Sequence, residues 1–154
     1  MRLSKNFSLG EFTKSNTASR LGLSNIPNKD HVGNLKTLTN FVLQPLREGL
    51  NYPINISSGY RGELLNTAIG GSKTSDHCFG KAADLDNDQY RKGQNADIFF
   101  FIKENLSFDQ LIWEFGDEES PSWVHVSYRS LNENRGQILV AYKDDNNKTQ
   151  YKLY

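Results

Sequence analysis

Cysteine is almost absent from this 154-residue sequence, where Cys78 is the only one. An internal disulfide is therefore excluded, and folding in a reducing compartment is allowed. No apolar run approaches the ~20 residues of a membrane span. The first residues, from Met1 to Asn6, also lack the apolar stretch of a signal peptide. We therefore expect a protein that is made in the cytoplasm and has no stable membrane association.

An excess of charge of either sign is also absent, because 18 lysines and arginines balance 18 aspartates and glutamates. Aromatic residues are plentiful and can stack on bases, but they come without a basic stripe, so nucleic acid is not an expected partner. The length suits one domain with a real hydrophobic core. We expect a single domain over residues 1–154, and a monomer is the default expectation.

Helical patterns come first along the chain and strand patterns come late. Residues 8–11 form a capping box that opens a short helix, and residues 15–27 are expected to be a loop. Apolar residues at helical spacing predict a helix from residue 28 or 30, loosened at Pro45 and ended near Gly49. Further helices are expected at 63–69 and 89–105, and strands at 54–57, 82–86, 110–115, 123–128, 137–143 and 149–153. This order predicts an α+β fold, with helices packed on one face of a mostly antiparallel sheet.

The segment from His77 to Asp84 has a spacing that permits a shared metal. A continuous helix would separate these two residues by about 10 Å, and a strand would separate them by more than about 20 Å. Zinc ligands lie ~2 Å from the ion, so the chain must fold back between them. Gly80 tolerates the positive φ of such a turn, and Ala82 and Ala83 are small enough for close approach. Spacing alone permits a site without proving one.

The alternation of side chains along the strands adds a third candidate ligand. If the apolar face of each strand looks toward the helices, Asp84, His125 and Glu114 all point to the open face of the sheet. Two imidazoles, from His77 and His125, and the Asp84 carboxylate make a three-ligand set that leaves a fourth position for water, as in catalytic zinc sites. Glu114 lies near enough in this arrangement to take a proton from that water.

Structural roles compete with each of these assignments. His125 taken alone suits a hydrogen-bonded strand histidine, and His77 taken alone suits a turn. His31, at the start of a helix, is expected to be a solvated surface residue. Cys78 is adjacent to His77, and ligation of one ion by sequence neighbours is strained, so we expect Cys78 to pack rather than bind metal.

Three motifs taken together resemble the D-Ala-D-Ala carboxypeptidase-like zinc peptidases. They are Ser58-Gly59-Tyr60-Arg61, then Ser75-x-His77-x-x-Gly80-x-Ala82-x-Asp84, then Trp123-Val124-His125. The resemblance covers roughly Leu3 to Tyr128 and is greatest to the compact phage endolysin branch. It implies the fold shared by hedgehog domains and DD-peptidases, with a zinc cleft on the sheet face opposite the helices.

The resemblance also implies roles for individual residues. One zinc ion would be held by His77, Asp84 and His125. Arg61 would lie near the reacting carbonyl or the substrate carboxylate, where a planar cation stabilises negative charge. Ser75 would position His77 or a peptide group of the substrate.

The implied activity is that of a metallo-carboxypeptidase or endopeptidase that hydrolyses amide bonds in peptidoglycan stem peptides. The bond would be either that of a D-Ala-D-Ala carboxypeptidase or that of an L-Ala-D-Glu-type endopeptidase. A phage or prophage cell-wall lytic enzyme is expected. Such a protein would act on the wall after release or as part of a virion.

One position departs from the family pattern. The better-known branches carry an acidic general base three residues before His125, where this chain has Ser122. A serine has no useful pKa for this task. Glu114 is favoured as the replacement, and the loop acids Glu118 and Glu119 are the alternatives. Two non-enzymatic readings also stand: a catalytically silent zinc-binding or wall-binding module, and a structural protein that reuses the fold without metal.

Overall fold

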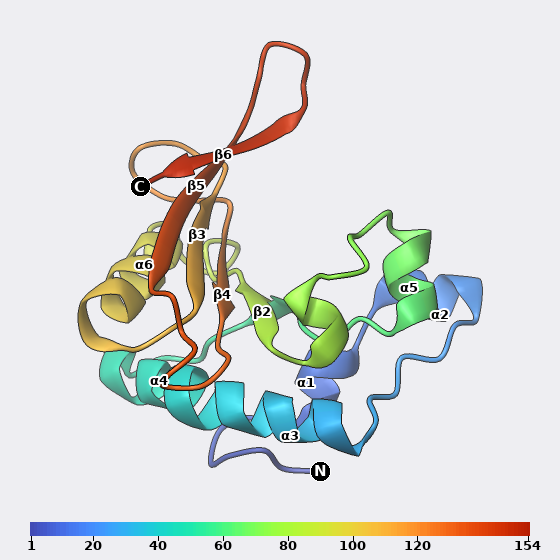
Figure 1. Ribbon diagram of the computed structural model, residues 1–154. Coiled ribbons are helices and arrows are strands. Elements are labelled where there is room, and N and C mark those ends of the chain that lie inside the picture. The colour runs from blue at the N-terminus through green and yellow to red at the C-terminus, as the bar shows by residue number, and fades with distance from the viewer.

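The computed structural model describes all residues, 1–154, as a six-stranded sheet with helices around it (Figure 1). The strands are β1 (Ile56–Ser58), β2 (Ala82–Leu85), β3 (Gln110–Glu114), β4 (Trp123–Ser127), β5 (Gln137–Lys143) and β6 (Thr149–Leu153). The helices are α1 (Leu9–Thr13), α2 (Asn16–Leu21), α3 (Lys29–Leu38), the π-helical η1 (Thr39–Leu43), α4 (Gln44–Leu50), α5 (Glu63–Ala68), the 3-10 helix η2 (Asp76–Phe79) and α6 (Gln94–Asn105).

The strand order across the sheet is β1-β2-β4-β3-β5-β6. Every neighbouring pair is antiparallel except β3 and β5, which run parallel. The predicted α+β class and mostly antiparallel sheet are therefore confirmed. The turn of the β5–β6 hairpin projects beyond the other strands at one end of the sheet, while α3 and α4 run beneath the sheet (Figure 1).

The core lies between the sheet and the helices α3, η1, α4 and α6. Alternate residues of the central strands enter it: Ala83 and Leu85 from β2, and Val124 and Val126 from β4, are fully buried. Complete burial of a branched aliphatic side chain stabilises the fold by about 1.5–3 kcal/mol. The predicted inward face of these strands is confirmed, and the residues between them are left to the opposite face. No helix is both long and apolar enough to pass through a membrane.

The segment from α3 to α4 is one continuous helical run, and Pro45 alters its geometry as predicted. A proline has no N–H to offer the carbonyl one turn earlier. Just before it the helix widens into the π-turn η1, where the Gln44 N–H donates to the Thr39 carbonyl. The predicted end near Gly49 is confirmed, since α4 ends at Leu50. Gly49 is not the residue that breaks the helix, because it lies inside α4 against the ring of Phe101. The cap is Asn51, which takes the left-handed conformation with φ 58°.

Three other predicted boundaries need correction. Residues 15–27 are not all loop, because Ser15 caps a short helix, α2, by accepting a hydrogen bond from the Ala18 N–H at 3.1 Å. The helix predicted from residue 89 begins at Gln94, because Asn95 turns back to bind the backbone N–H of Asn87 at 2.7 Å. The first strand begins two residues late, at Ile56.

Candidate active site

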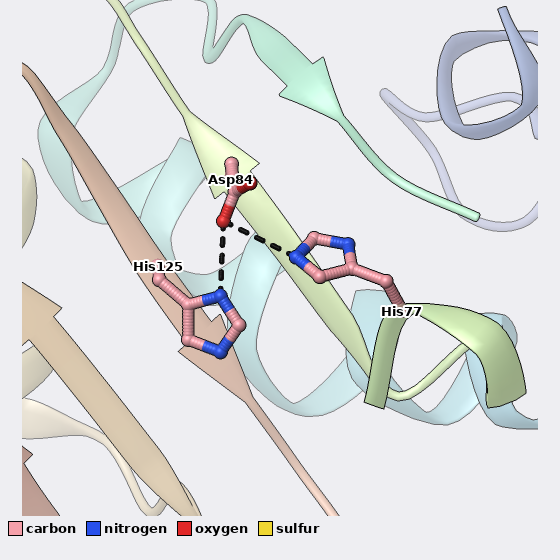
Figure 2. Close-up of side chains that lie close together, drawn as sticks. All are labelled: His77, Asp84 and His125. Carbon is pink, nitrogen blue, oxygen red and sulfur yellow. Dashed lines mark hydrogen bonds and ion pairs between the residues drawn. The ribbon is translucent and has the colours of Figure 1, made fainter. Parts of the chain in front are cut away.

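Three side chains predicted as ligands converge on one point of the open sheet face (Figure 2). His77 Nε2 lies 3.3 Å, and His125 Nδ1 2.9 Å, from the same oxygen, Oδ1 of Asp84. One nitrogen or oxygen of each residue lies within 4.8 Å of those of the other two. The side chains come from η2, β2 and β4, so the predicted fold-back between His77 and Asp84 is observed.

The local backbone explains why these residues meet. Gly80 ends η2 with φ 71°, and a β-carbon there would lie 2.5 Å from the His31 carbonyl oxygen. The chain therefore turns sharply at this glycine and returns as β2. In the antiparallel pairing of β2 with β4, Asp84 lies directly opposite His125. Side chains at such opposed positions are close neighbours on one face of a sheet.

The proton on His77 is placed by a backbone contact. Its Nδ1 lies 2.7 Å from the carbonyl oxygen of Gly59, which can only accept a hydrogen bond. Nδ1 therefore carries a proton, and Nε2 is the ring nitrogen that faces Asp84. Only a second proton or a metal ion between Nε2 and the carboxylate makes that contact favourable. The contact with Gly59 is thus the orienting second bond that metal-ligating histidines usually make.

The donor set fits a zinc ion. Two ligands at ~2.0–2.1 Å from a tetrahedral zinc lie about 3.3 Å apart, close to the two separations measured at Asp84. Burial would raise the pKa of Asp84, but the neighbouring His77 and His125 outweigh it and hold that pKa well below its ordinary range. The carboxylate is therefore ionised, the state in which it binds metal.

Glu114, on β3, lies on the same face and has an unusual environment. It is 7% exposed, and burial raises the pKa of its carboxyl to about 7, with His125 lowering it and Asp84 adding to the rise. A carboxyl that titrates near neutral pH is suited to accept and return a proton. The alternative acids, Glu118 and Glu119, are exposed loop residues, and neither lines the cleft around the three ligands.

These groups line one cleft of about 740 Å³, a size typical of ligand-binding sites. Arg61 and Ser75 are on its wall, where the Arg61 Nη2 donates to the Ser75 hydroxyl at 3.3 Å. The same hydroxyl accepts from the backbone N–H of His77 at 3.3 Å. The Nε of Arg61 is buried without a hydrogen-bond partner. Ser75 thus connects Arg61 to the segment that carries His77, one of the three candidate metal ligands.

His31 and Cys78 stand apart from the metal group. The expectation of a solvated His31 needs correction, since its ring is half-buried, bonds the Tyr60 hydroxyl at 3.1 Å and packs edge-on against Phe79. The turn at Gly80 brings η2 down onto α3 and covers this histidine. Cys78 is also half-buried and takes no part in the three-ligand group.

Several lining residues were missed by the sequence analysis: Gln110, Arg129, Arg135, Thr149 and Tyr151. The strand alternation that predicted Glu114 applies equally to Gln110, four residues earlier on β3. Alternation on β6 likewise pairs Thr149 with Tyr151, but it does not reveal which face meets the cleft. The two arginines lie on a connecting segment, where no periodic pattern exists to place them.

The geometry first defines a class: an open three-ligand metal centre beside a buried carboxylate is the arrangement of a metal-dependent hydrolase. Comparison with protein families then matches residues 5–127 to the family described as Peptidase M15. The match spans well over half of the chain, which therefore belongs to this family of D-Ala-D-Ala carboxypeptidase-like zinc peptidases. A search of curated proteins gives no match.

Proposed function

We propose that this protein is a zinc peptidase that hydrolyses amide bonds in peptidoglycan stem peptides, as a phage- or prophage-type cell-wall lytic enzyme. The observation that carries the proposal is the convergence of three ligand atoms beside Glu114 in one cleft. Family membership supports a zinc peptidase with peptidoglycan-type substrates. In this proposal the protein is made in the cytoplasm and meets the wall after release or as part of a virion.

His77, Asp84 and His125 would hold the zinc, with Gly59 fixing the tautomer of the first. Zinc bound there would supply a Lewis acid for the scissile carbonyl and lower the pKa of a coordinated water toward ~7. Glu114 takes the proton from the attacking water and returns it to the leaving amine. Its position on a strand inside the sheet holds the carboxylate still between the two transfers.

Arg61 also lines the cleft and has a supporting role. Its guanidinium is fixed at one end by Ser75 and offers its remaining donors to the oxyanion that forms as the carbonyl is attacked. Ser75 also accepts a hydrogen bond from the backbone N–H of His77. It therefore fixes the Arg61 guanidinium relative to the segment that carries His77. Both residues therefore act on the carbonyl side of the reaction, and Glu114 acts on the water side.

The test measures zinc content and peptide hydrolysis for the wild type, Glu114→Gln and Glu119→Gln. Glu119 is the matched control, because the same change is made at an exposed loop acid outside the cleft. We expect all three proteins to bind one zinc. We expect Glu114→Gln to lose roughly 10²–10⁴-fold in kcat, the usual contribution of a general base, and Glu119→Gln to match the wild type. Stem peptides that end in D-Ala-D-Ala, or that contain only the L-Ala-D-Glu bond, identify the bond cut.

A second candidate function follows from the exposed Ser122, which stands where a general base is usual in this family. It is a catalytically silent zinc module that binds wall peptides. A wild type that holds zinc and binds stem peptides but releases no new amino termini would favour this module over the peptidase. A wild type that hydrolyses the peptides only when Glu114 is intact would exclude it.

A further inference from the structure

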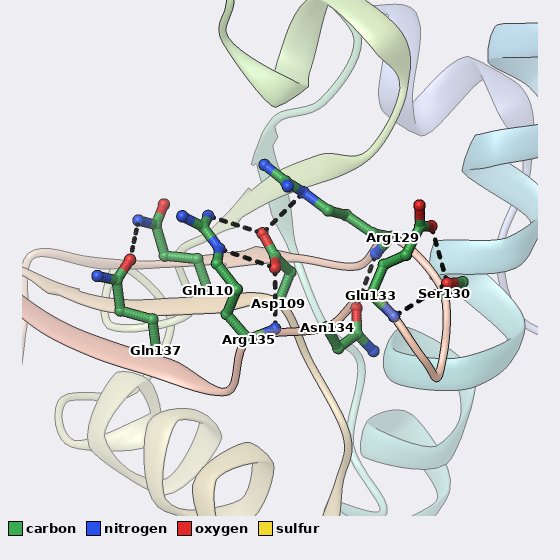
Figure 3. Close-up of polar contacts among 8 residues, drawn as sticks. All are labelled: Asp109, Gln110, Arg129, Ser130, Glu133, Asn134, Arg135 and Gln137. Atoms are coloured by element: carbon green, nitrogen blue, oxygen red, sulfur yellow. Dashed lines mark hydrogen bonds and ion pairs between the residues drawn. The ribbon is translucent and has the colours of Figure 1, made fainter.

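Two arginines that line the cleft share one buried carboxylate (Figure 3). Asp109 has no exposed surface, and Arg135 grips it with two parallel bonds, Nε to Oδ1 at 3.0 Å and Nη2 to Oδ2 at 2.9 Å. Arg129 Nε adds a third at 3.1 Å to Oδ2. Burial would raise the pKa of Asp109, but the bonds and charges of Arg135, joined by the charge of Arg129, lower it. The carboxylate is thus ionised and its oxygens are occupied.

The two arginines keep hydrogen-bond donors that Asp109 does not use, and the cluster carries a net positive charge. Two guanidinium groups against one carboxylate leave a net charge of +1 within the cluster. Arg129 uses only its Nε on Asp109, so both of its Nη groups are free of that carboxylate. The side chains of Arg129 and Arg135 are 39% and 48% exposed, and both line the metal cleft. A planar, partly desolvated pair of guanidiniums is suited to bind a second carboxylate.

Other charged groups near the cluster do not use these donors. Asp76 lines the same cleft and its charge acts on Arg135, yet neither arginine forms an ion pair with it. Glu133, on the adjoining loop, accepts from the Ser130 hydroxyl at 2.8 Å. Beside the arginines, the side-chain amide of Gln110 donates to that of Gln137 at 2.9 Å (Figure 3). This pair is polar but carries no charge.

The strand register places the cluster relative to the metal. Ile112 lies opposite His125, Gln110 lies two residues earlier on β3, and Asp109 comes directly before Gln110. Glu114 is two residues away in the other direction. At ~3.3 Å per residue, the carboxylate that holds the arginines belongs to a residue about 10 Å along the strand from the ligands, on the side away from the proposed base. An extended peptide would reach them within about two to three residues of the scissile bond.

We propose that Arg129 and Arg135 form a subsite for an acidic group of the substrate, a carboxylate two to three residues from the bond that is cut. The inference rests on the proposed function and deepens it, because it assigns the cleft a preference for acidic stem peptides. Both arginines lie beyond residue 127, outside the segment matched to the family. Asp109 is the positioning residue that fixes the two guanidiniums, and the spare donors of Arg129 make the contact.

The test compares two stem peptides that differ only in carrying a free carboxylate or a carboxamide at that position. Their equilibrium binding is measured by calorimetry on zinc-loaded protein with Glu114→Gln, so that neither peptide is consumed. We expect the carboxylate peptide to bind roughly tenfold more tightly than the carboxamide. Adding Arg129→Gln should remove this preference, and adding Arg129→Lys should restore part of it. Adding Arg20→Gln, the same change at an exposed arginine of α2, should leave it intact.

Equal binding of the two peptides, or a preference that survives Arg129→Gln, would overturn the subsite. Wild-type hydrolysis is measured separately and tests the proposed function. A protein that prefers the carboxylate peptide but cuts neither would retain the subsite and lose the peptidase. A protein that neither binds nor cuts either peptide would overturn both. Because Arg135 still holds Asp109 in the Arg129 variants, loss of folding is not the expected result of either change.

Discussion

Residues 5–127 and residues 128–154 build the same cleft in different ways. The first segment matches Peptidase M15 and supplies the three candidate ligands and Glu114 from well-packed elements; His77 is 2% exposed. The second segment supplies Arg129, Arg135 and Tyr151 from a connecting loop and from β6, whose five residues are all exposed.

This difference indicates that the first segment carries the reaction and the second segment recognises the substrate. Groups that hold a metal or move a proton must stay within a fraction of an ångström, and burial in the sheet provides that rigidity. Groups that select a substrate tolerate exposure and act through charge and shape. We therefore expect changes in the first segment to alter turnover and metal content, and changes in the second to alter substrate preference or stability.

The largest expected effect comes from a metal ligand. Asp84→Asn replaces an ionised ligand with a neutral amide, and we expect loss of stoichiometric zinc together with a fall in hydrolysis of roughly 10³-fold or more. Elemental analysis and peptide hydrolysis measure the two effects. Asp30→Asn, at an exposed position of α3, is the matched control. Full activity of Asp84→Asn without bound metal would show that the ligand group does not take part in hydrolysis.

The pH profile tests the buried base. Glu114 must be deprotonated to accept a proton, and its pKa is raised to about 7, so kcat/KM should fall as the pH drops through that value. The charge of a bound zinc lowers this pKa, which puts the acid limb at or below pH 7. The profile of the wild type is compared with the residual activity of Glu114→Gln, which should lack this limb. An identical limb in both proteins would assign it to another group.

The two arginines should differ in their effect on stability. Arg135 makes the bidentate pair with the buried Asp109, so Arg135→Gln should lower the free energy of unfolding by about 2 kcal/mol. Arg129 contributes only one bond to that carboxylate, and Arg129→Gln should cost less than about 1 kcal/mol. Denaturant unfolding of both variants measures the difference. Equal losses would mean that Arg129 is structural rather than free to bind a substrate.

The smallest expected effect is at Tyr151, on the exposed β6 wall of the cleft. Partial burial raises the pKa of its hydroxyl, and the charges of Glu114 and Asp84 add to the rise, so the group stays protonated and offers a donor to the cleft. Tyr151→Phe should raise KM by only a few-fold without changing kcat. Tyr142→Phe, a neighbouring tyrosine outside this cleft, is the control. A large fall in kcat would move Tyr151 into the reaction itself.

The fold and the metal group were predictable because both follow from short-range rules. Alternation along β2 and β4 placed Asp84 and His125 on one face, and Gly80 indicated the turn that returns His77 to them. The helix widens into a π-turn just before Pro45, because proline has no backbone N–H to donate. These features depend on residues close in sequence, where periodicity and backbone chemistry decide the structure.

The rest of the site depended on contacts that no local pattern encodes. The hydrogen bond from His77 to Gly59 joins two segments that are 18 residues apart. The ion pair of Arg135 with Asp109 joins the start of β3 to the segment that precedes β5. His31 was predicted to be solvated because its sequence neighbours are polar, whereas its cover comes from Phe79. Tertiary packing of this kind has to be observed.

The bond between Gly59 and His77 links the metal chemistry to the start of the chain. Gly59 lies so close to Phe12 that a β-carbon there would sit 2.6 Å from the Phe12 carbonyl oxygen, and the next residue, Tyr60, donates its N–H to that same oxygen at 2.7 Å. The short helix α1 therefore packs against the segment whose carbonyl group orients His77. We therefore expect changes at Phe12 to alter the orientation of His77, although Phe12 itself does not line the cleft of the candidate metal group.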